Sequence, residues 1–383
     1  MSEEQVRPGL ENVVAAETRL SKIDGDSGEL VIGGFPVEEL AANASFEETV
    51  SLLWTDELPR GPELEAFGRR LAERRPISPA TRESLREAAE AGLPAMDALR
   101  IGAASASLAP GADVGGDGGD DVDQAPLIVA QLPTVVATYW RFRQGEEPVA
   151  PRADLSHAAN YLYMLTGEEP SAAQVAGLET YLNTVVDHGL NASTFTARTI
   201  ASTESDVVSA VTGAIGALKG PLHGGAPGPV LEMLQEIDEA GDPEGYLREK
   251  LEAGERLMGF GHRVYDTRDP RAAVLSDAAE QFYRDGEGGR FFELAREIED
   301  VAVDLLAEYK PGRDLATNVE FYTAVLLHGV GIPRELFSAT FAVSRVGGWT
   351  AHYKEQQEDN RLIRPRASYV GETDREWVPV EQR

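Results

Sequence analysis

The chain has 383 residues, of which 42% are hydrophobic, and this is enough for two or three domains with a sizeable core. It contains no cysteine, which excludes disulfides, thiolate metal sites and a cysteine nucleophile and is typical of a reducing compartment. Its 65 Asp and Glu against 35 Lys and Arg give a formal net charge of −30, which disfavours binding to nucleic acid.

The ends and the hydropathy of the chain indicate where it works. The first residues show no basic region followed by an apolar run, so they do not resemble a signal peptide. No apolar stretch approaches the ~20 residues of a membrane span. We therefore expect a cytoplasmic protein.

The excess of acidic residues has two explanations, disorder and adaptation to high salt. The helical periodicity described below disfavours disorder. At about 1 M salt the Debye length is roughly 3 Å, so surface carboxylates stop repelling one another. We predict that the fold needs molar salt. Dialysis into dilute buffer should then abolish activity and helical circular dichroism, and full retention of both would refute the prediction.

The secondary structure is predicted to be almost entirely helical. Near the N-terminus, the segment ELVIGG (29–34) follows the turn DGDSG and is expected to form half of a small hairpin. The Gly/Asp-rich segment 108–126 is expected to be a solvated acidic loop, because its spacing does not match a calcium-binding loop. Apolar residues at helical spacing predict helices over 154–170, 171–189, 206–220, 291–312 and 334–349. Gly167 is expected to end the first of these, and Pro311 with Gly312 the fourth. There is no internal repeat.

Two glycine-rich stretches resemble nucleotide-binding motifs but do not match them. GFGHRV (259–264) lacks the third glycine of a dinucleotide fingerprint, and no strand is predicted before it. GPLHGGAPG (220–228) lacks the Lys-Ser/Thr of a phosphate-binding loop. Nucleotide chemistry therefore has no support.

Three histidines stand at helix ends or in tight loops, where packing gains little. His188 lies in VVDHGLNASTF, where Ser193 or Thr194 is expected to cap the next helix. His223 lies in GPLHGGAP, and His262 follows two glycines in MGFGHRVYDTRDPR. Glycine allows a positive φ or a close approach of the backbone to a ligand. We interpret the three as converging on one site. The other histidines are expected to have packing or surface roles: His157, His328 and His352.

The residues near these histidines favour an anionic organic ligand. Three histidines and a carboxylate can hold zinc, but no two of the three are spaced i, i+4 and there is no HExxH motif. Arginine grips carboxylates with two hydrogen bonds, and the candidates are Arg271, Arg345 and Arg364. In NVEFY, Asn318 is predicted to cap a helix and to place Glu320 in its first turn. Burial there would raise the pKa of Glu320, which makes it a candidate general base.

Several motifs together resemble the citrate synthase family, in the shorter type found in archaea and many bacteria. They are HGLNASTF, GPLHGGA, GFGHRVY followed by DPR, NVEFY, VSRVGGW and RPR, and the likeness covers nearly the whole chain. With the acidic composition, the resemblance indicates a member from a halophile. The resemblance implies an all-α, two-domain homodimer. It implies a large domain of residues 1–224 and 332–383 and a small domain of residues 225–331, which close over the substrate.

The resemblance also implies a reaction, the condensation of acetyl-CoA with oxaloacetate and hydrolysis of the thioester, which feeds the tricarboxylic acid cycle. Glu320 would take a methyl proton, neutral His223 would donate to the enol oxygen, and His262 would donate to the oxaloacetate carbonyl. Neither a metal nor a redox cofactor is implied. The residues implied for oxaloacetate are His188, Asn191, Arg271, Arg345 and, from the partner subunit, Arg364. The residues implied for CoA are Leu257, Met258, Gly259, Phe260, Gly261, Arg313 and Arg366.

Two positions depart from the family pattern. Glu320 stands where the family normally has aspartate, so the carboxylate is one methylene further from the backbone. Asp266 stands where a basic or uncharged polar residue is usual, and it cannot bind a CoA phosphate. We expect Lys310, Arg313 or Arg366 to supply that charge.

Two alternatives remain open at this stage. The first is a 2-methylcitrate synthase, which carries out the same chemistry on propionyl-CoA. The second is a catalytically silent acyl-CoA-binding regulatory homologue, although retention of three histidines and a carboxylate argues against it.

Overall fold

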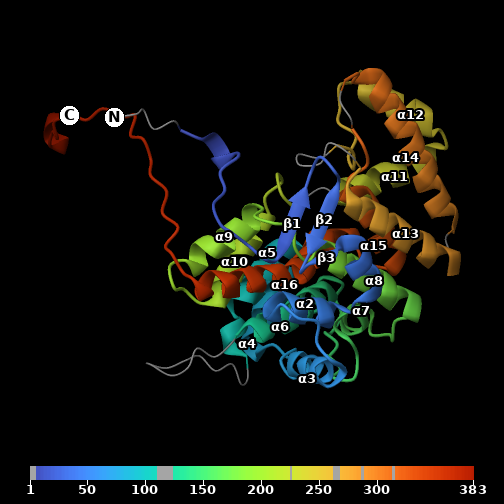
Figure 1. The fold of residues 1–383 in the computed structure, drawn as a ribbon, viewed down its shortest axis with the longest axis horizontal. Helices are drawn as coiled ribbons and strands as arrows, with labels where there is room; N and C mark the ends of the chain where they lie inside the picture. The colour runs from blue at the N-terminus through green and yellow to red at the C-terminus, as the bar shows by residue number, and fades with distance from the viewer. Residues whose placement is uncertain (1–5, 110–123, 225–226, 262–267, 286–288, 313–314) are drawn as a thin grey trace.

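The computed structural model describes residues 6–109, 124–224, 227–261, 268–285, 289–312 and 315–383, and helices dominate it (Figure 1). The helices in chain order are α1 (Val37–Asn43), α2 (Phe46–Thr55), α3 (Gly61–Ala72), α4 (Pro79–Glu90), α5 (Ala95–Ala104), α6 (Ala125–Arg143), α7 (His157–Thr166), α8 (Ala172–Val185), α9 (Ala192–Ala201), α10 (Val207–Leu218), α11 (Pro227–Ala240), α12 (Pro243–Glu252), α13 (Pro270–Asp285), α14 (Gly289–Tyr309), α15 (Val319–Val330) and α16 (Phe337–Glu358). Short 3-10 turns are η1 (Pro8–Leu10), η2 (Ala106–Leu108), η3 (Arg334–Leu336) and η4 (Val380–Gln382). None of the helices in the described ranges is both long enough and apolar enough to span a bilayer.

The predicted N-terminal hairpin is confirmed, with one addition. β1 (Ser21–Asp24) and β2 (Glu29–Ile32) pair antiparallel across the predicted turn, and Ser21 lies opposite Ile32. A third strand of two residues, β3 (Phe35–Pro36), pairs with β2. The predicted acidic loop falls mostly on 110–123, outside the described residues.

The predicted helices are confirmed as α7, α8, α10, α14 and, after the turn η3, α16. Gly167 ends α7 with a φ of 83°, and α14 ends at Tyr309, just before Pro311 and Gly312. One predicted cap is wrong. Asn191, and neither Ser193 nor Thr194, caps α9, because its side-chain oxygen accepts the N–H groups of both those residues. Asparagine is at least as good a cap as serine or threonine, and an N-cap residue has non-helical backbone. Asn191 has extended backbone, whereas Ser193 and Thr194 already lie within the helix.

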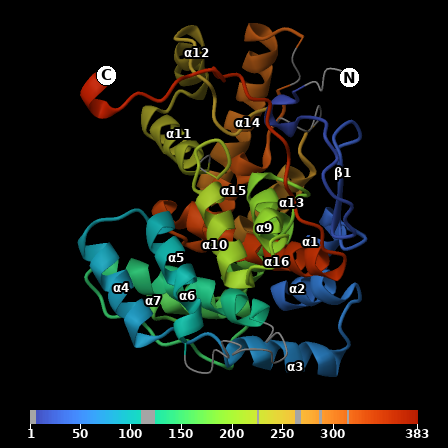
Figure 2. The ribbon, with the colours of Figure 1, turned by 90° about the vertical axis from the view of Figure 1, so that its left-hand side faces the viewer.

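Helix α16 runs through the centre of the core. It packs against α2, α5, α6, α8, α9 and α10, and in both views it lies between α9 and α10 on one side and α2 and α6 on the other (Figures 1 and 2). Trp349 and Arg345 of α16 are among the largest fully buried side chains. A polar side chain that is buried this deeply needs hydrogen-bond partners, so α16 is an organising element for the site described below.

Helices α11, α12 and α14 form one end of the molecule (Figures 1 and 2). Helices α13 and α15 pack against each other and against α8, and so link this end to the rest. The N-termini of α13 and α15, which carry Arg271 and Glu320, therefore belong to the helices that connect the two parts of the molecule. The domain boundaries at 224/225 and 331/332 remain a prediction.

Two carboxyl groups lie where α2, α7 and α8 meet, that of Glu47 buried and that of Glu179 partly buried. Glu47 Oε1 accepts the backbone N–H of His157 at 2.7 Å, and Glu179 Oε2 accepts the backbone N–H of Phe46 at 2.7 Å. Burial, together with repulsion from Glu47, raises the pKa of Glu179 to about 8 from an ordinary 4.5. Near neutral pH the folded protein therefore keeps a proton on Glu179 that the unfolded chain releases.

This proton makes stability depend on pH. Because the pKa of Glu179 is higher in the folded protein than in the unfolded chain, Glu179 contributes to the free energy of unfolding. This contribution is fully present below about pH 4.5 and is lost as the pH rises through about 8. Glu179→Gln, which is neutral at every pH, should therefore gain Tm relative to wild type between about pH 4.5 and about pH 8, and the gain should level off above that range. Glu87→Gln, at an exposed position of α4, is the control for replacing a carboxyl group by an amide. A Glu179→Gln offset that does not change with pH would contradict this assignment.

Candidate active site

Arg345 lies at the centre of the candidate site, on the buried face of α16. Its side chain is 1% exposed, Nε donates to the carbonyl of Val185 at 2.6 Å, and the guanidinium stands 4.6 Å from the ring centre of Phe341. Burial lowers the pKa of Arg345 to about 10, and the carboxylate of Asp187 opposes that fall. Arg345 is still a cation at neutral pH, and it is fixed in place before any ligand binds.

His223 follows the C-terminus of α10 and is half-buried. Its Nε2 lies 2.8 Å from Ser193 Oγ and 3.3 Å from the backbone nitrogen of Ser193. A backbone N–H can only donate, so Nε2 is the acceptor and the ring proton resides on Nδ1. Trp349 supports this arrangement, because its Nε1–H donates to Ser193 Oγ at 3.1 Å.

The charge state of His223 is set by its surroundings. Burial, and then the positive charge of Arg345, lower the pKa of His223 to about 4. The imidazole is therefore neutral at physiological pH and has one N–H, at Nδ1, that Ser193 does not engage. A neutral donor of this kind can stabilise an oxygen on which negative charge develops.

Glu320 stands in the first turn of α15, as predicted. Asn318 caps the helix, and its Oδ1 accepts the backbone N–H of Glu320 at 3.0 Å. Burial raises the pKa of Glu320 to about 7, although Arg271 and Arg345 lower it and Asp269 raises it further. A carboxyl group with this pKa can accept a proton near neutral pH, which is what a general base requires.

Arg271 stands at the start of α13 and is 5% exposed. It forms a two-point ion pair with buried Asp269, with Nε–Oδ1 at 3.0 Å and Nη2–Oδ2 at 2.8 Å. Asp269 Oδ2 also accepts the backbone N–H of Val319 at 3.3 Å, next to Glu320. This carboxylate therefore joins the N-termini of α13 and α15 and holds Arg271 beside Glu320.

The glycines before His262 adopt the conformations for which glycine is suited. Gly259 has φ 91° and Gly261 has φ 77°. The segment is pinned to the chain before Glu320: Phe260 bridges Thr317, Gly261 N–H donates to the carbonyl of Ala316 at 2.8 Å, and Asn318 Nδ2 donates to the carbonyl of Gly261 at 2.8 Å. The predicted CoA-contacting residues 257–261 thus lie beside the N-terminus of α15. His262, Asp266 and Arg313 lie outside the described residues.

Gly259→Ala is expected to lower the free energy of unfolding by at least about 1 kcal/mol, because a side chain at positive φ is strained. The added Cβ would also stand 3.0 Å from Phe321 Cδ2 and 3.3 Å from Val230 Cγ2. Denaturant unfolding in molar salt measures the effect. The matched control is Gly68→Ala in α3, where the added Cβ would meet no atom within 4 Å outside the backbone of its own helix. This change should raise the free energy of unfolding by ~0.5–1 kcal/mol, because alanine favours a helix more than glycine does. Equal effects of the two changes would contradict this explanation.

The remaining predicted site residues occupy different settings. His188 is buried and comes directly after Asp187. Asn191 uses its side chain to cap α9 and to bind the carbonyls of His188 and Gly189, and its predicted contact with substrate is untested. Arg364 and Arg366 are exposed on the segment after α16, which leaves the body of the molecule (Figure 1). Within the described residues, then, His223, Arg271 and Glu320 are grouped around Arg345, whereas Arg364 is not.

Sequence reasoning missed the groups that hold these residues in place. Ser193 and Trp349 orient His223, and Asp269 orients Arg271. Trp349 is four residues after Arg345 and so lies on the same helix face, which was a usable signal. The partner of Ser193 is 30 residues away, and no local pattern reveals that pairing.

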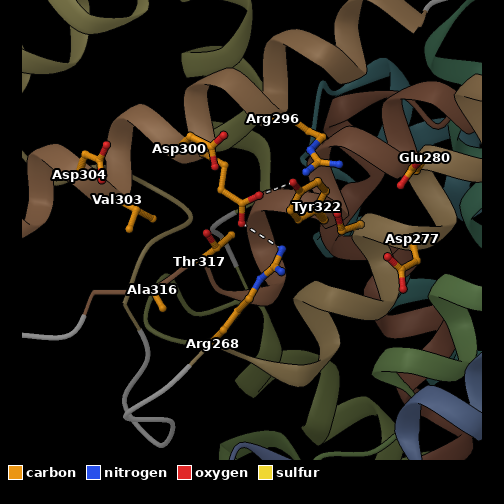
Figure 3. A pocket seen from close by; sticks show the side chains of 12 residues that line it. Arg268, Asp277, Glu280, Arg296, Asp300, Val303, Asp304, Ala316, Thr317 and Tyr322 are labelled. Carbon is orange, nitrogen blue, oxygen red and sulfur yellow. Dashed lines mark hydrogen bonds and ion pairs between the residues drawn. The ribbon is translucent and has the colours of Figure 1, made fainter.

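A separate hollow of about 660 Å³ lies between α13 and α14, beside Thr317 (Figure 3). Its walls are strongly charged, and Arg268 is paired with Glu299 at 3.1 Å, while Tyr322 also donates to Glu299. No histidine is among the described residues that line it. Across the described part of the chain, no group of three or more His, Asp or Glu side chains has a geometry that could hold a metal ion.

The fold and the site together define a class of protein, an almost wholly helical enzyme with a neutral histidine, a carboxyl group titrating near neutrality and buried arginines for an anionic substrate. Comparison with known proteins agrees. The family model described as citrate synthase, C-terminal domain, matches residues 9–366. The chain belongs to the citrate synthase family, and it is a transferase of the citrate (Si)-synthase type.

Individual relatives are similar over nearly their full length. Citrate synthase from the halophile Haloferax volcanii is 45% identical over 384 residues, covering 99% of both chains. A 2-methylcitrate synthase from Mycobacterium tuberculosis is 38% identical and covers 97% of this chain and 92% of its own. Among solved structures, the ternary complex of carboxymethyl coenzyme A and oxaloacetate with citrate synthase from Thermoplasma acidophilum has a TM-score of 0.86 at 30% identity, covering 98% and 99% of the two chains.

Proposed function

We propose that the chain condenses acetyl-CoA with oxaloacetate to citryl-CoA and hydrolyses the thioester to citrate and CoA. The observation that carries the proposal is the grouping around Arg345: neutral His223, whose Nδ1–H is not engaged by Ser193, and Glu320 with a pKa of about 7. The relative trapped with oxaloacetate and a coenzyme A analogue supports the same pair of substrates.

In this mechanism Glu320 takes a proton from the methyl group of acetyl-CoA. The electron pair of the broken C–H bond forms the C=C bond of an enolate, and the Nδ1–H of His223 donates a hydrogen bond to the enolate oxygen. The enolate carbon then bonds to the carbonyl carbon of oxaloacetate, whose oxygen receives a proton from His262. The proton taken by Glu320 is released to solvent, from which His262 regains its own. Water cleaves the thioester bond and gives citrate and the free thiol. Arg271 and Arg345 bind the carboxylates of oxaloacetate.

The acyl substrate is the point at which close relatives differ. We propose acetyl-CoA because the relatives named citrate synthase reach higher identity than those named 2-methylcitrate synthase. The test is the ratio of kcat/KM for acetyl-CoA to that for propionyl-CoA, with oxaloacetate saturating. A ratio above one supports the proposal, a ratio well below one indicates a 2-methylcitrate synthase, and no thiol release with either indicates a silent homologue.

We also propose a homodimer in which Arg364 reaches the partner's site. The exposed segment after α16 supports this, because Leu362, on the same segment, is also largely exposed in the single chain. Oxaloacetate would bind first and close the domains, which completes the CoA site. Calorimetry should show acetyl-CoA binding only in the presence of oxaloacetate, and equal binding in its absence would count against this order.

A further inference from the structure

One buried face of α16 runs along the segment that ends at His188. Arg345 Nε donates to the carbonyl of Val185, Gly348 packs against Val186 and Asp187, and His352 Nε2 lies 3.2 Å from Asp187 Oδ1. These helix positions are separated by three and four residues, so they form one stripe. A Cβ at Gly348 would lie 2.9 Å from Asp187 Oδ1, so the close approach depends on glycine.

The tautomer of His352 is fixed from its other side. Arg198 Nη1 lies 3.0 Å from His352 Nδ1, and a guanidinium can only donate, so Nδ1 is an acceptor. The ring proton is then on Nε2 and points to Asp187. Both His352 and Asp187 are fully buried. Arg198 is itself held by Glu355 at 2.5 Å and Gln356 at 3.0 Å, so the orientation of the ring is set by groups away from the active site.

Ser21 holds Asp187 and the residue after His188 together. Its hydroxyl donates to Asp187 Oδ2 at 2.5 Å and accepts the backbone N–H of Gly189 at 2.9 Å. Both neighbours of His188 are therefore tied to one side chain of β1. Each oxygen of the Asp187 carboxylate has a donor, and neither donor is Arg345.

Asp187 is thus a buried anion next to a buried cation with which it forms no direct hydrogen bond. Although burial alone would raise it, His352, Arg345 and Ser21 hold the pKa of Asp187 below its usual value, so it is ionised. A carboxylate kept in place by other donors balances the charge of Arg345 without occupying its outer nitrogens. Those nitrogens stay available for a carboxylate of the substrate.

We propose that Asp187, fixed by His352 and Ser21, is the positioning residue of the subsite that binds an oxaloacetate carboxylate. It balances the charge of Arg345 and helps to hold the backbone on either side of His188. The role rests on the proposed function. If the donors are lost, the Asp187 carboxylate can turn toward Arg345 and compete with the substrate. Loss of these donors should therefore weaken the binding of oxaloacetate and leave the binding of acetyl-CoA nearly unchanged.

The test compares His352→Leu with Thr350→Val in steady-state kinetics with oxaloacetate and acetyl-CoA in molar salt. Thr350 is equally buried on the same helix, and it accepts a hydrogen bond from Trp54 at 3.0 Å, away from the site. His352→Leu should raise KM for oxaloacetate about 10-fold, because a buried hydrogen bond contributes about that much to affinity. The values of kcat and of KM for acetyl-CoA should stay within about threefold of wild type. Thr350→Val should leave all three parameters near wild type. His352→Gln, which keeps a donor near the Nε2 position, should restore KM to within about threefold of wild type.

Equal KM values for oxaloacetate in folded His352→Leu and Thr350→Val would overturn the proposal. If His352→Leu does not fold, Ser21→Ala takes its place, because Ser21 is half-buried on a strand edge, and an unchanged KM in that variant would likewise overturn it. A wild-type chain that releases no thiol counts against the proposed function alone. Calorimetric titration with oxaloacetate then tests the positioning role directly, with the same expected difference in affinity.

Discussion

Glu320→Gln is expected to lower kcat by about 10²–10⁴-fold, the usual contribution of one general base. The amide has the shape of the carboxyl group but cannot take the methyl proton. Oxaloacetate binding should remain nearly intact, because Arg271 and Arg345 keep their buried partners Asp269 and Val185. Steady-state kinetics measure the fall, and calorimetry with oxaloacetate is the control.

A first-turn glutamate with no catalytic role would behave differently. Its conversion to glutamine would cost at most ~1 kcal/mol of helix stability and leave kcat unchanged. Wild-type turnover in Glu320→Gln would therefore refute the mechanism. Glu320→Asp tests geometry, because the charge is kept and the carboxylate is withdrawn by roughly 1 Å. We expect a loss of about 10²-fold, since the backbone here is matched to the longer side chain.

The same residue predicts the acid limb of the pH profile. The pKa of Glu320 is about 7, so the base is protonated, and inactive, at lower pH. The value of kcat/KM for acetyl-CoA should therefore fall about tenfold for each pH unit below about 7. His223, with a pKa of about 4, should contribute no break in this range. A profile that stays flat from about pH 5 to about pH 8 would contradict the raised pKa.

His223→Ala is expected to lower kcat by about 10²–10³-fold, the range found when one donor to a developing oxyanion is removed. The location of the ring proton makes a sharper test possible. The amide nitrogen of asparagine lies near the Nδ1 position of histidine, whereas that of glutamine lies near Nε2. His223→Asn should therefore recover at least about tenfold relative to His223→Ala, and His223→Gln should not.

The reverse result, with recovery by glutamine and none by asparagine, would place the catalytic proton on Nε2 and contradict the role of Ser193 as a donor to that atom. Equal activity in all three variants and in wild type would remove His223 from the mechanism. Circular dichroism in molar salt serves as the control for folding in each case.

Much of this architecture could be predicted because it follows from local chemistry. Gly167 after an apolar stripe predicts the end of α7, and Asn318 predicts the cap that puts Glu320 in the first turn of α15. The positive φ of Gly259 and Gly261 agrees with the glycines being selected for backbone conformation. His157, expected to have a packing or surface role, is buried against the ring of Phe46.

The rest depends on contacts between segments that are distant in the sequence. His352 was expected to pack or to lie on the surface, but it is a buried donor to Asp187, 165 residues earlier. The pKa values of Glu320 and His223 likewise depend on burial by distant segments and on Arg345, which lies on a different element from either residue. Long-range burial and pairing of this kind leave no local periodicity in the sequence.

The most direct measurement is the rate of thiol release by wild type and Glu320→Gln, with acetyl-CoA and oxaloacetate in molar potassium chloride. We predict that wild type releases thiol only when both substrates are present, and that Glu320→Gln does so at least about 10² times more slowly. Release from acetyl-CoA alone, no release by wild type, or equal rates in the two proteins would contradict a condensation in which Glu320 is the base.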